Sequence, residues 1–158
     1  MDSLGMKVYL AGPLFNDGER GTLTRIASRL REAGIEVFVP HEQFVELEGL
    51  DAKGVFATDL AGIEGANLVL AWLDGTQVDD GTAVEIGIFR QLCKLDPTHY
   101  RGIVGLCTDL RMARRRGAAP GDGINLFVVG AIESVGEITW TEDDAITAAL
   151  KRLNEEIV

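Results

Sequence analysis

The feature that most constrains the fold of this chain is a repeated alternation between short apolar runs and helix-length amphipathic segments. The apolar runs predict strands over Lys7–Ala11, Ile35–Val39, Asn67–Leu73, Gly102–Cys107 and Glu137–Trp140. The amphipathic segments predict helices over Thr22–Ala33, Val55–Ile63 and Thr82–Leu92, and a terminal helix from Thr141 to about Ile157. This alternation is typical of βαβ units. It predicts an α/β fold, a doubly wound parallel sheet of about five strands, Rossmann-like or flavodoxin-like, with helices on both faces.

Some segments do not follow the alternation. His41–Gly49 is predicted to be a loop over the sheet edge, and Asn125–Ile132 is too short to classify. Asp109–Gly123 is rich in Arg, Ala and Gly, and irregular segments of this length are usually functional or mobile, so it is a candidate lid. Leu95–Arg101, before the fourth strand, and Asp109–Gly123 are candidate walls for a ligand pocket.

Composition narrows the class of partner. The chain has 158 residues and a net charge of −10, which predicts one domain over residues 1–158 and excludes polyanionic partners such as nucleic acid or an anionic membrane. Cys93 and Cys107 lie in apolar contexts without metal-ligand spacing and are expected to be reduced core thiols. No signal peptide or membrane span is recognisable, so we expect a soluble, cytoplasmic protein. The acidic charge favours a small, mostly neutral substrate. We expect neither a metal nor a cofactor.

An acidic glycine turn, Asp79–Gly87, follows the apolar run Asn67–Leu73. In an open α/β sheet this point lies in the crevice at the carboxyl end of a strand, where ligands bind, and the helix dipole there favours an ionised carboxylate. Glu85 is therefore a candidate nucleophile. The same residues also fit a capping box, in which Thr82 and Glu85 satisfy backbone donors at a helix start. The local pattern alone favours the capping interpretation.

The predicted topology brings other polar residues to the same edge. Because the carboxyl ends of parallel strands meet there, Tyr9–Phe15, the turn with Glu85, and the loop ending at Asn125 are expected to converge. Asp59, on the helix before the third strand, is placed near them. The set contains carboxylates, a phenol, an amide and an aromatic ring, without a metal triad or a Ser/His pair.

Four pieces of the chain resemble the nucleoside 2-deoxyribosyltransferase family in order and approximate spacing. They are Tyr9–Pro13, Asp59–Ile63, Asp79–Gly87 and Ile124–Leu126. The resemblance implies an enzyme of nucleoside salvage that moves 2-deoxyribose between free nucleobases. It places the nucleophile on Glu85, which attacks the anomeric carbon and holds the sugar as a covalent ester until a second base displaces it, as in a retaining glycosidase.

The leaving base needs a proton or a hydrogen bond. The resemblance gives this role to Asp79, six residues before Glu85, with Asp59 close by. Carboxylates that share a pocket cannot all ionise freely, so one is expected to have a raised pKa and to act as the acid, and we favour Asp79. Asp80 is the alternative pocket residue, although a solvated turn position is its ordinary role.

The resemblance also assigns the remaining site residues, each beside an ordinary structural alternative. Tyr9 orients the nucleophile or is simply a packed strand aromatic. Gly12 allows close approach of the backbone and Phe15 stacks on the base, or both only shape the turn. Asn125 holds the sugar 5′-hydroxyl from a neighbouring subunit, which implies a homo-oligomer, or it caps the helix before Leu126.

Two other functions compete with transfer. A 2′-deoxynucleoside 5′-monophosphate N-glycosidase would need a phosphate cradle near the first loop, but Asp17 and Glu19 would repel a phosphate there. The basic cluster Arg111, Arg114, Arg115 and Arg116 keeps this alternative open. A non-catalytic nucleoside-binding module would be expected to lack one of the five polar site residues. All five are present: Tyr9, Asp59, Asp79, Glu85 and Asn125. We therefore predict deoxyribosyl transfer, without a prediction for purine or pyrimidine bases.

Overall fold

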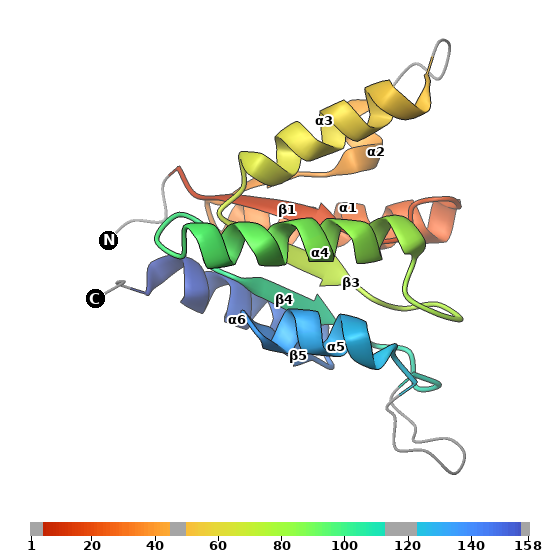
Figure 1. The fold of residues 1–158 in the computed structure, drawn as a ribbon. Coiled ribbons are helices and arrows are strands. Elements are labelled where there is room, and N and C mark those ends of the chain that lie inside the picture. Colours follow the sequence, from red (N-terminus) through yellow and green to blue (C-terminus); the bar gives the residue numbers. More distant parts are fainter. Residues whose placement is uncertain (1–4, 45–49, 113–122, 156–158) are drawn as a thin grey trace.

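A five-stranded, entirely parallel sheet organises the molecule, in the strand order β2-β1-β3-β4-β5 (Figure 1). The computed structural model describes residues 5–44, 50–112 and 123–155. Its strands are β1 (Lys7–Ala11), β2 (Glu36–Phe38), β3 (Leu68–Trp72), β4 (Ile103–Leu106) and β5 (Glu137–Thr139). All five strands were predicted within a residue or two of their ends. The order is that of flavodoxin-like doubly wound folds, which confirms the predicted fold class.

Helices cover both faces of this sheet (Figure 1). They are α1 (Asp17–Glu32), α2 (Pro40–Gln43), α3 (Ala52–Glu64), α4 (Asp80–Leu95), α5 (Leu126–Glu133) and α6 (Glu142–Asn154). The buried faces of α1 and α6 share one apolar cluster with the sheet, and residues of α4 and α5 share the other. The described helices are too short or too polar to span a lipid bilayer.

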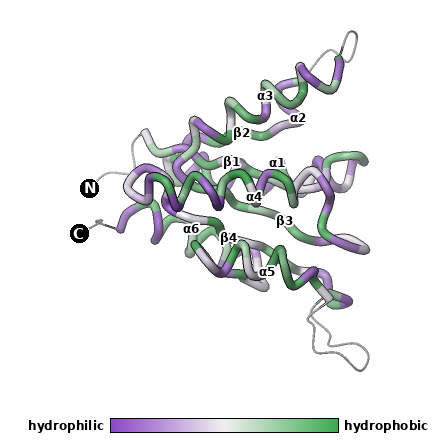
Figure 2. Tube along the Cα trace, viewed as in Figure 1, coloured by the Kyte–Doolittle hydropathy of each residue, from purple (hydrophilic) through white to green (hydrophobic). Residues whose placement is uncertain are grey.

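The strands form because their side chains are buried on both sides. In β1, Val8 and Leu10 enter the cluster under α1 and α6, whereas Tyr9 and Ala11 enter the cluster under α4. Side chains alternate across a strand, so a strand covered on both faces reads as a continuous apolar run. Figure 2 shows the same distribution, with hydrophobic colour concentrated along the strands and along α5. The alternation turns Tyr9 toward α4, the helix that carries Glu85.

The structure corrects several predicted boundaries. α1 begins at Asp17, five residues before the prediction, because Asn16 and Glu19 form a capping box. Pro40–Gln43 is a short helix, α2, where a loop was predicted; residues 45–49 of that loop lie outside the described residues. The segment left unclassified is the helix α5, and α6 ends at Asn154, since Glu155 is already extended.

The start of α4 is the correction that matters most for the site. The helix begins at Asp80 and its N-cap is Asp79, whose side chain accepts a hydrogen bond from the Thr82 amide. The predicted capping box of Thr82 with Glu85 is therefore wrong. Glu85 lies in the second turn of α4, beyond the residues that cap the helix, and is free to serve another purpose.

Candidate active site

A cavity of about 540 Å³ opens at the carboxyl ends of β1 and β3. The strand order reverses between these two strands, which is where doubly wound folds bind ligands. The cavity is lined by Gly12, Leu14, Phe15, Arg20, Pro40, His41, Phe44, Leu50, Val55, Asp59, Asp79, Gly81, Thr82 and Glu85. The predicted site residues Gly12, Phe15, Asp59, Asp79 and Glu85 are thus brought together from three separate segments of the chain.

Tyr9 and Glu85 form the centre of this site. The Tyr9 side chain is fully buried on β1, and its hydroxyl donates a hydrogen bond of 2.5 Å to Glu85 Oε1. Burial and the neighbouring carboxylates raise the pKa of Tyr9, so the hydroxyl keeps its proton and remains a donor. The contact fixes one oxygen of the Glu85 carboxylate from beneath the cavity.

Two carboxyl groups of the site have strongly raised pKa values. Burial raises the pKa of Glu85 to about 7; the Tyr9 hydrogen bond opposes this rise, and the charges of Asp59 and Asp79 add to it. The helix dipole, expected to favour ionised Glu85, is outweighed because Glu85 lies beyond the first turn of α4. Burial also raises the pKa of Asp59 to about 6, and its Oδ1 is buried without a hydrogen-bond partner.

Asp79 and Asp80 differ in what their carboxylates do. Asp79 lines the cavity, and its Oδ2 accepts hydrogen bonds from the amide and the hydroxyl of Thr82 at 3.0 and 3.2 Å. Asp80 is exposed, lies outside the cavity lining, and accepts a hydrogen bond from the Gly81 amide. Of the two aspartates, Asp79 is the one beside the cavity, and it also begins the helix that carries Glu85.

Gly12 and Phe15 lie on the loop that leaves β1. A Cβ atom at Gly12 would lie 3.0 Å from Leu23 Cδ2 and 3.2 Å from Trp72 Cβ, so the end of β1 packs tightly against β3 and α1. Phe15 lines the cavity while 72% of its surface is exposed. Its ring therefore lies at the mouth of the cavity, open to a planar ligand or to solvent.

Asn125 is not brought to this cavity. It caps α5, and its side-chain oxygen accepts a hydrogen bond of 2.9 Å from the Phe127 amide. The structural alternative predicted for Asn125 is therefore present within the single chain. Most of the candidate lid Asp109–Gly123, with three of the four clustered arginines, lies outside the described residues.

Several cavity residues were not predicted. His41 begins the segment that was predicted to be a loop, but it is part of α2 and lines the cavity, as do Phe44 and Leu50 beyond it. Burial lowers the pKa of His41, which favours the neutral ring. The residues of this segment show no helical or strand periodicity in the sequence. The local signal was Pro40, which ends the preceding predicted strand.

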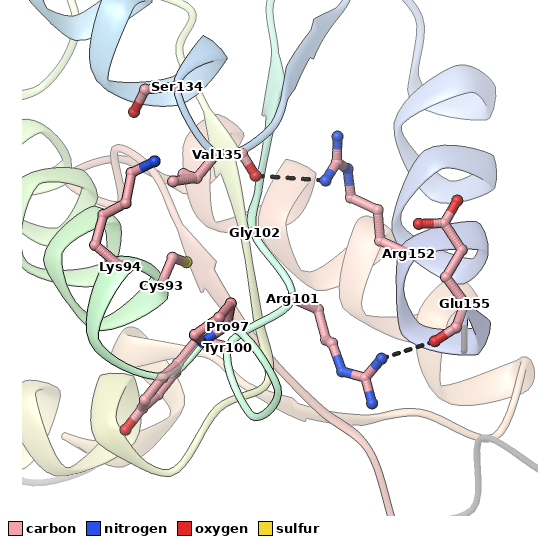
Figure 3. Close-up of a pocket in the computed structure, with 10 residues that line it drawn as sticks. All are labelled: Cys93, Lys94, Pro97, Tyr100, Arg101, Gly102, Ser134, Val135, Arg152 and Glu155. Atoms are coloured by element: carbon pink, nitrogen blue, oxygen red, sulfur yellow. Dashed lines mark hydrogen bonds between the residues drawn. The ribbon is translucent and has the colours of Figure 1, made fainter. Parts of the chain in front are cut away.

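A second cavity, of about 370 Å³, lies at the opposite, amino-terminal end of the sheet (Figure 3). Its lining includes Tyr100 and Arg101, so the segment Leu95–Arg101 is not a wall of the carboxyl-end cavity, and that expectation is wrong. Figure 3 shows Arg101 donating a hydrogen bond to the Glu155 carbonyl and Arg152 donating one to the Val135 carbonyl. These bonds connect α6 and the sheet, which gives this region a structural role.

Comparisons with known proteins agree with this arrangement. The sequence model of a family described as nucleoside 2-deoxyribosyltransferase matches residues 8–133. A conserved protein from Enterococcus faecalis V583 shares the fold at a TM-score of 0.77 and 25% identity, over 93% of this chain and 98% of that chain. No curated protein sequence matches the chain.

Two solved structures described as deoxyribosyltransferases share the fold at lower identity. The 2-deoxyribosyltransferase from Bacillus psychrosaccharolyticus has a TM-score of 0.66 at 24% identity, over 93% of this chain and 95% of that chain. The enzyme from Leishmania mexicana has a TM-score of 0.65 at 14% identity, over 96% and 99%.

Proposed function

Because this chain belongs to the nucleoside 2-deoxyribosyltransferase family, we propose that it transfers 2-deoxyribose between nucleobases through an ester on Glu85. The observation that carries the proposal is the hydrogen bond from the buried Tyr9 hydroxyl to Glu85 Oε1 at the carboxyl-end cavity. A capping or packing glutamate needs no buried phenol held against it. A nucleophile does, because its carboxylate group must be held in one orientation before the substrate arrives.

The first displacement forms a bond from Glu85 to the anomeric carbon. With Oε1 held by Tyr9, Oε2 of Glu85 attacks C1′ of the deoxynucleoside while the C1′–N bond breaks and its electron pair leaves with the base. In the second displacement a ring nitrogen of another base attacks C1′ and passes its proton to the carboxylate that protonated the first base, while Glu85 leaves as a carboxylate. Both steps pass through oxocarbenium-like transition states, which a sugar without a 2′-hydroxyl reaches more readily.

In this proposal the departing base takes its proton from Asp59, in place of Asp79, the residue that the family resemblance favours. Its pKa of about 6 and its unpartnered Oδ1 both fit a carboxyl group that is protonated for part of the time. With Glu85 at about 7, the two groups together hold roughly one proton between pH 6 and 7, and the reactive form has it on Asp59. Asp79, already an acceptor for Thr82, then aligns α4 and contacts the base.

Charge around the cavity supports a nucleoside over a 5′-monophosphate. Asp17 and Glu19 lie in the first turn of α1, and Asp79 and Asp80 occupy the start of α4, so both helix N-termini near the cavity already carry carboxylates. Arg20, the arginine among the described lining residues, is bonded to Asp17 and to the Leu14 carbonyl. A phosphate would compete with these acids.

The apolar side chains that line the cavity favour binding of a nucleobase. Pro40, Phe44, Leu50 and Val55 form a wall, and Phe15 lies at the mouth. Such a wall excludes water from one face of a planar base and favours capture of a second base over hydrolysis.

A homo-oligomer in which Asn125 completes the site of a neighbouring subunit is part of this proposal. Leu126 and Phe127, next to Asn125, are 58% and 88% exposed, as is expected of side chains that another subunit covers. Mixing inactive Glu85→Gln and Asn125→Ala subunits tests it. Hybrid oligomers should regain activity, because some sites then combine an intact Glu85 with an intact Asn125; no recovery after subunit exchange would contradict it.

The test of the reaction uses deoxyinosine with and without free adenine, followed by chromatography. Transfer predicts deoxyadenosine only when adenine is present. Free hypoxanthine and deoxyribose at the same rate in both tubes would instead indicate hydrolysis. An inert deoxyinosine, together with base release from deoxynucleoside 5′-monophosphates, would show that the charge argument against a phosphate is wrong.

A further inference from the structure

Tyr9 does not hold its position alone. Its partner in the neighbouring strand is Phe38 of β2, in direct register. The two rings are stacked, with centroids 5.2 Å apart and planes inclined by 14°. The ring that carries the Tyr9 hydroxyl therefore rests on Phe38, at the edge of the sheet.

Phe38 is in turn fixed by a glycine of α3. A Cβ atom at Gly62 would lie 2.7 to 2.8 Å from the Cε1, Cζ and Cε2 atoms of the Phe38 ring, closer than real Cβ contacts. The α3 backbone thus packs directly on the ring, which only glycine permits. Asp59 precedes Gly62 by three residues, one turn of the same helix, so this contact also seats the helix that carries the proposed acid.

We propose that Phe38 and Gly62 are positioning residues for the nucleophile: the close contact of α3 with the Phe38 ring holds Tyr9 so that its hydroxyl stays on Glu85. That this positioning serves catalysis rests on the proposed function. The positioning itself is a property of the protein without substrate, and it can be measured without activity.

Groups on three elements face Glu85 and set its pKa. Tyr9 of β1 lowers the pKa through its hydrogen bond, and Asp59 of α3 and Asp79 before α4 raise it through their charges. The Tyr9 hydrogen bond is the largest of these three influences. Displacing Tyr9 should therefore raise the pKa of Glu85, and this sign distinguishes loss of positioning from entry of water, which would lower it.

The decisive variant is Gly62→Ala, because the added methyl group displaces the Phe38 ring without opening a void. We expect it to raise the apparent pKa of Glu85 by about 1 to 2, the size of one hydrogen bond to a charged group. The measurement is carbon NMR titration of the protein labelled at the glutamate carboxyl carbon, with the Glu85 signal assigned by its loss in Glu85→Gln.

The same substitution is then made in a Tyr9→Phe background. If Gly62 acts through the Tyr9 hydroxyl, Tyr9→Phe raises the pKa by itself, and adding Gly62→Ala causes no further rise. Gly21→Ala in α1 is the matched control: a Cβ there meets no atom within 4 Å, so the pKa of Glu85 should not change.

Two outcomes would overturn the proposal: an unchanged Glu85 pKa in folded Gly62→Ala protein, or an equal rise in the Tyr9→Phe background. If Gly62→Ala does not fold, Phe38→Leu is used instead, because it removes the stacking ring without crowding Gly62. The Glu85 pKa of this variant is then compared with and without Tyr9→Phe, and the same two outcomes apply. Where the protein is active, the basic limb of the kcat–pH profile should move upward with the NMR pKa and the maximal kcat should fall, because Glu85 is the later of the two acids to lose its proton. Inactive protein with the expected NMR shifts would contradict the proposed function and leave the positioning intact.

Discussion

The cavities at the two ends of the same parallel sheet differ in how their charged groups are compensated. At the carboxyl end, burial raises the pKa values of Glu85 and Asp59 to about 7 and about 6. At the amino end, Arg152 donates hydrogen bonds to the Glu137 carboxylate and to the Val135 carbonyl, and Arg101 donates one to the Glu155 carbonyl. One end keeps acids that titrate near neutral pH; the other uses hydrogen bonds from arginine side chains to hold the end of α6 against the sheet.

The difference shows how a site is distinguished from a cavity. The amino end also contains an unpartnered buried atom, Arg101 Nε, and a thiol, Cys93, whose pKa burial raises to about 11. The Cys93 thiol therefore stays neutral near pH 7. Volume alone does not separate the two ends, but the chemistry of their buried groups does.

Glu85→Gln should produce the largest effect on this contrast. Glutamine keeps the shape and can still contact Tyr9, but its amide is not a nucleophile, so we expect kcat for deoxyribosyl transfer to fall by about 10⁴-fold or more. Circular dichroism should show an unchanged fold. The matched control is Glu137→Gln, which removes a carboxylate at the amino end and should leave kcat within about twofold of wild type. Near-normal transfer by folded Glu85→Gln would remove Glu85 from the mechanism.

Asp59→Asn should have the next largest effect. Losing the proton donor should lower kcat for deoxyinosine by about 10²- to 10³-fold. The loss should be much smaller for a 7-methylated purine deoxynucleoside, whose base is already cationic and leaves without a proton. Activity should also stop falling above pH 7, because no acid then has to stay protonated.

Two aspartate variants complete that comparison. Asp80→Asn, at an exposed position outside the cavity, should retain wild-type kcat. Asp79→Asn should lower kcat and also destabilise α4, since it changes the helix cap. If Asp79→Asn, and not Asp59→Asn, is rescued by the cationic leaving group, the proton donor is Asp79.

The raised pKa of Glu85 also predicts how stability depends on pH. Its folded-state value of about 7 exceeds the ordinary 4.5, so the native state binds the proton more tightly than the unfolded state. Its contribution is fully present below about pH 4.5 and is lost as the pH rises through about 7, by about 1 to 3 kcal/mol. Urea denaturation at pH 4.5 and 8.5 measures this. Relative to wild type, Glu85→Gln should gain stability at pH 8.5, and an equal difference at both pH values would contradict the burial argument.

Sequence patterns predicted the parts of this molecule that follow from periodicity and topology. The apolar runs indicated the five described strands, and the rule that carboxyl ends of parallel strands meet brought the loop after β1 and the turn with Asp79 and Glu85 to one edge. The cap of α4 could not be predicted, because a threonine three residues before a glutamate fits a capping box as well as it fits the interior of a helix.

Other features depend on contacts that leave no local pattern. His41 and Phe44 line the cavity because α2 follows directly after the carboxyl end of β2, and no periodicity marks this short helix. The stacking of Phe38 on Tyr9 depends on strand register, and the place of Gly62 depends on how α3 sits on the sheet. Asn125 has a single-chain role as a helix cap, which sequence could state only as an alternative.

The smallest expected effect comes from the amino end. Arg152→Met keeps the length and apolar stem of the side chain but removes the bonds to Glu137 and Val135, so we expect the free energy of unfolding to fall by about 1 kcal/mol. Lys151→Met, at an exposed lysine 3.8 Å from Glu155, should change stability less. Neither variant should alter kcat or its pH profile, because neither residue faces a group that titrates in the reaction. A change in the pH profile of Arg152→Met would show that the two ends of the sheet are coupled, and that the amino-end cations help to set the charge of the carboxyl-end site.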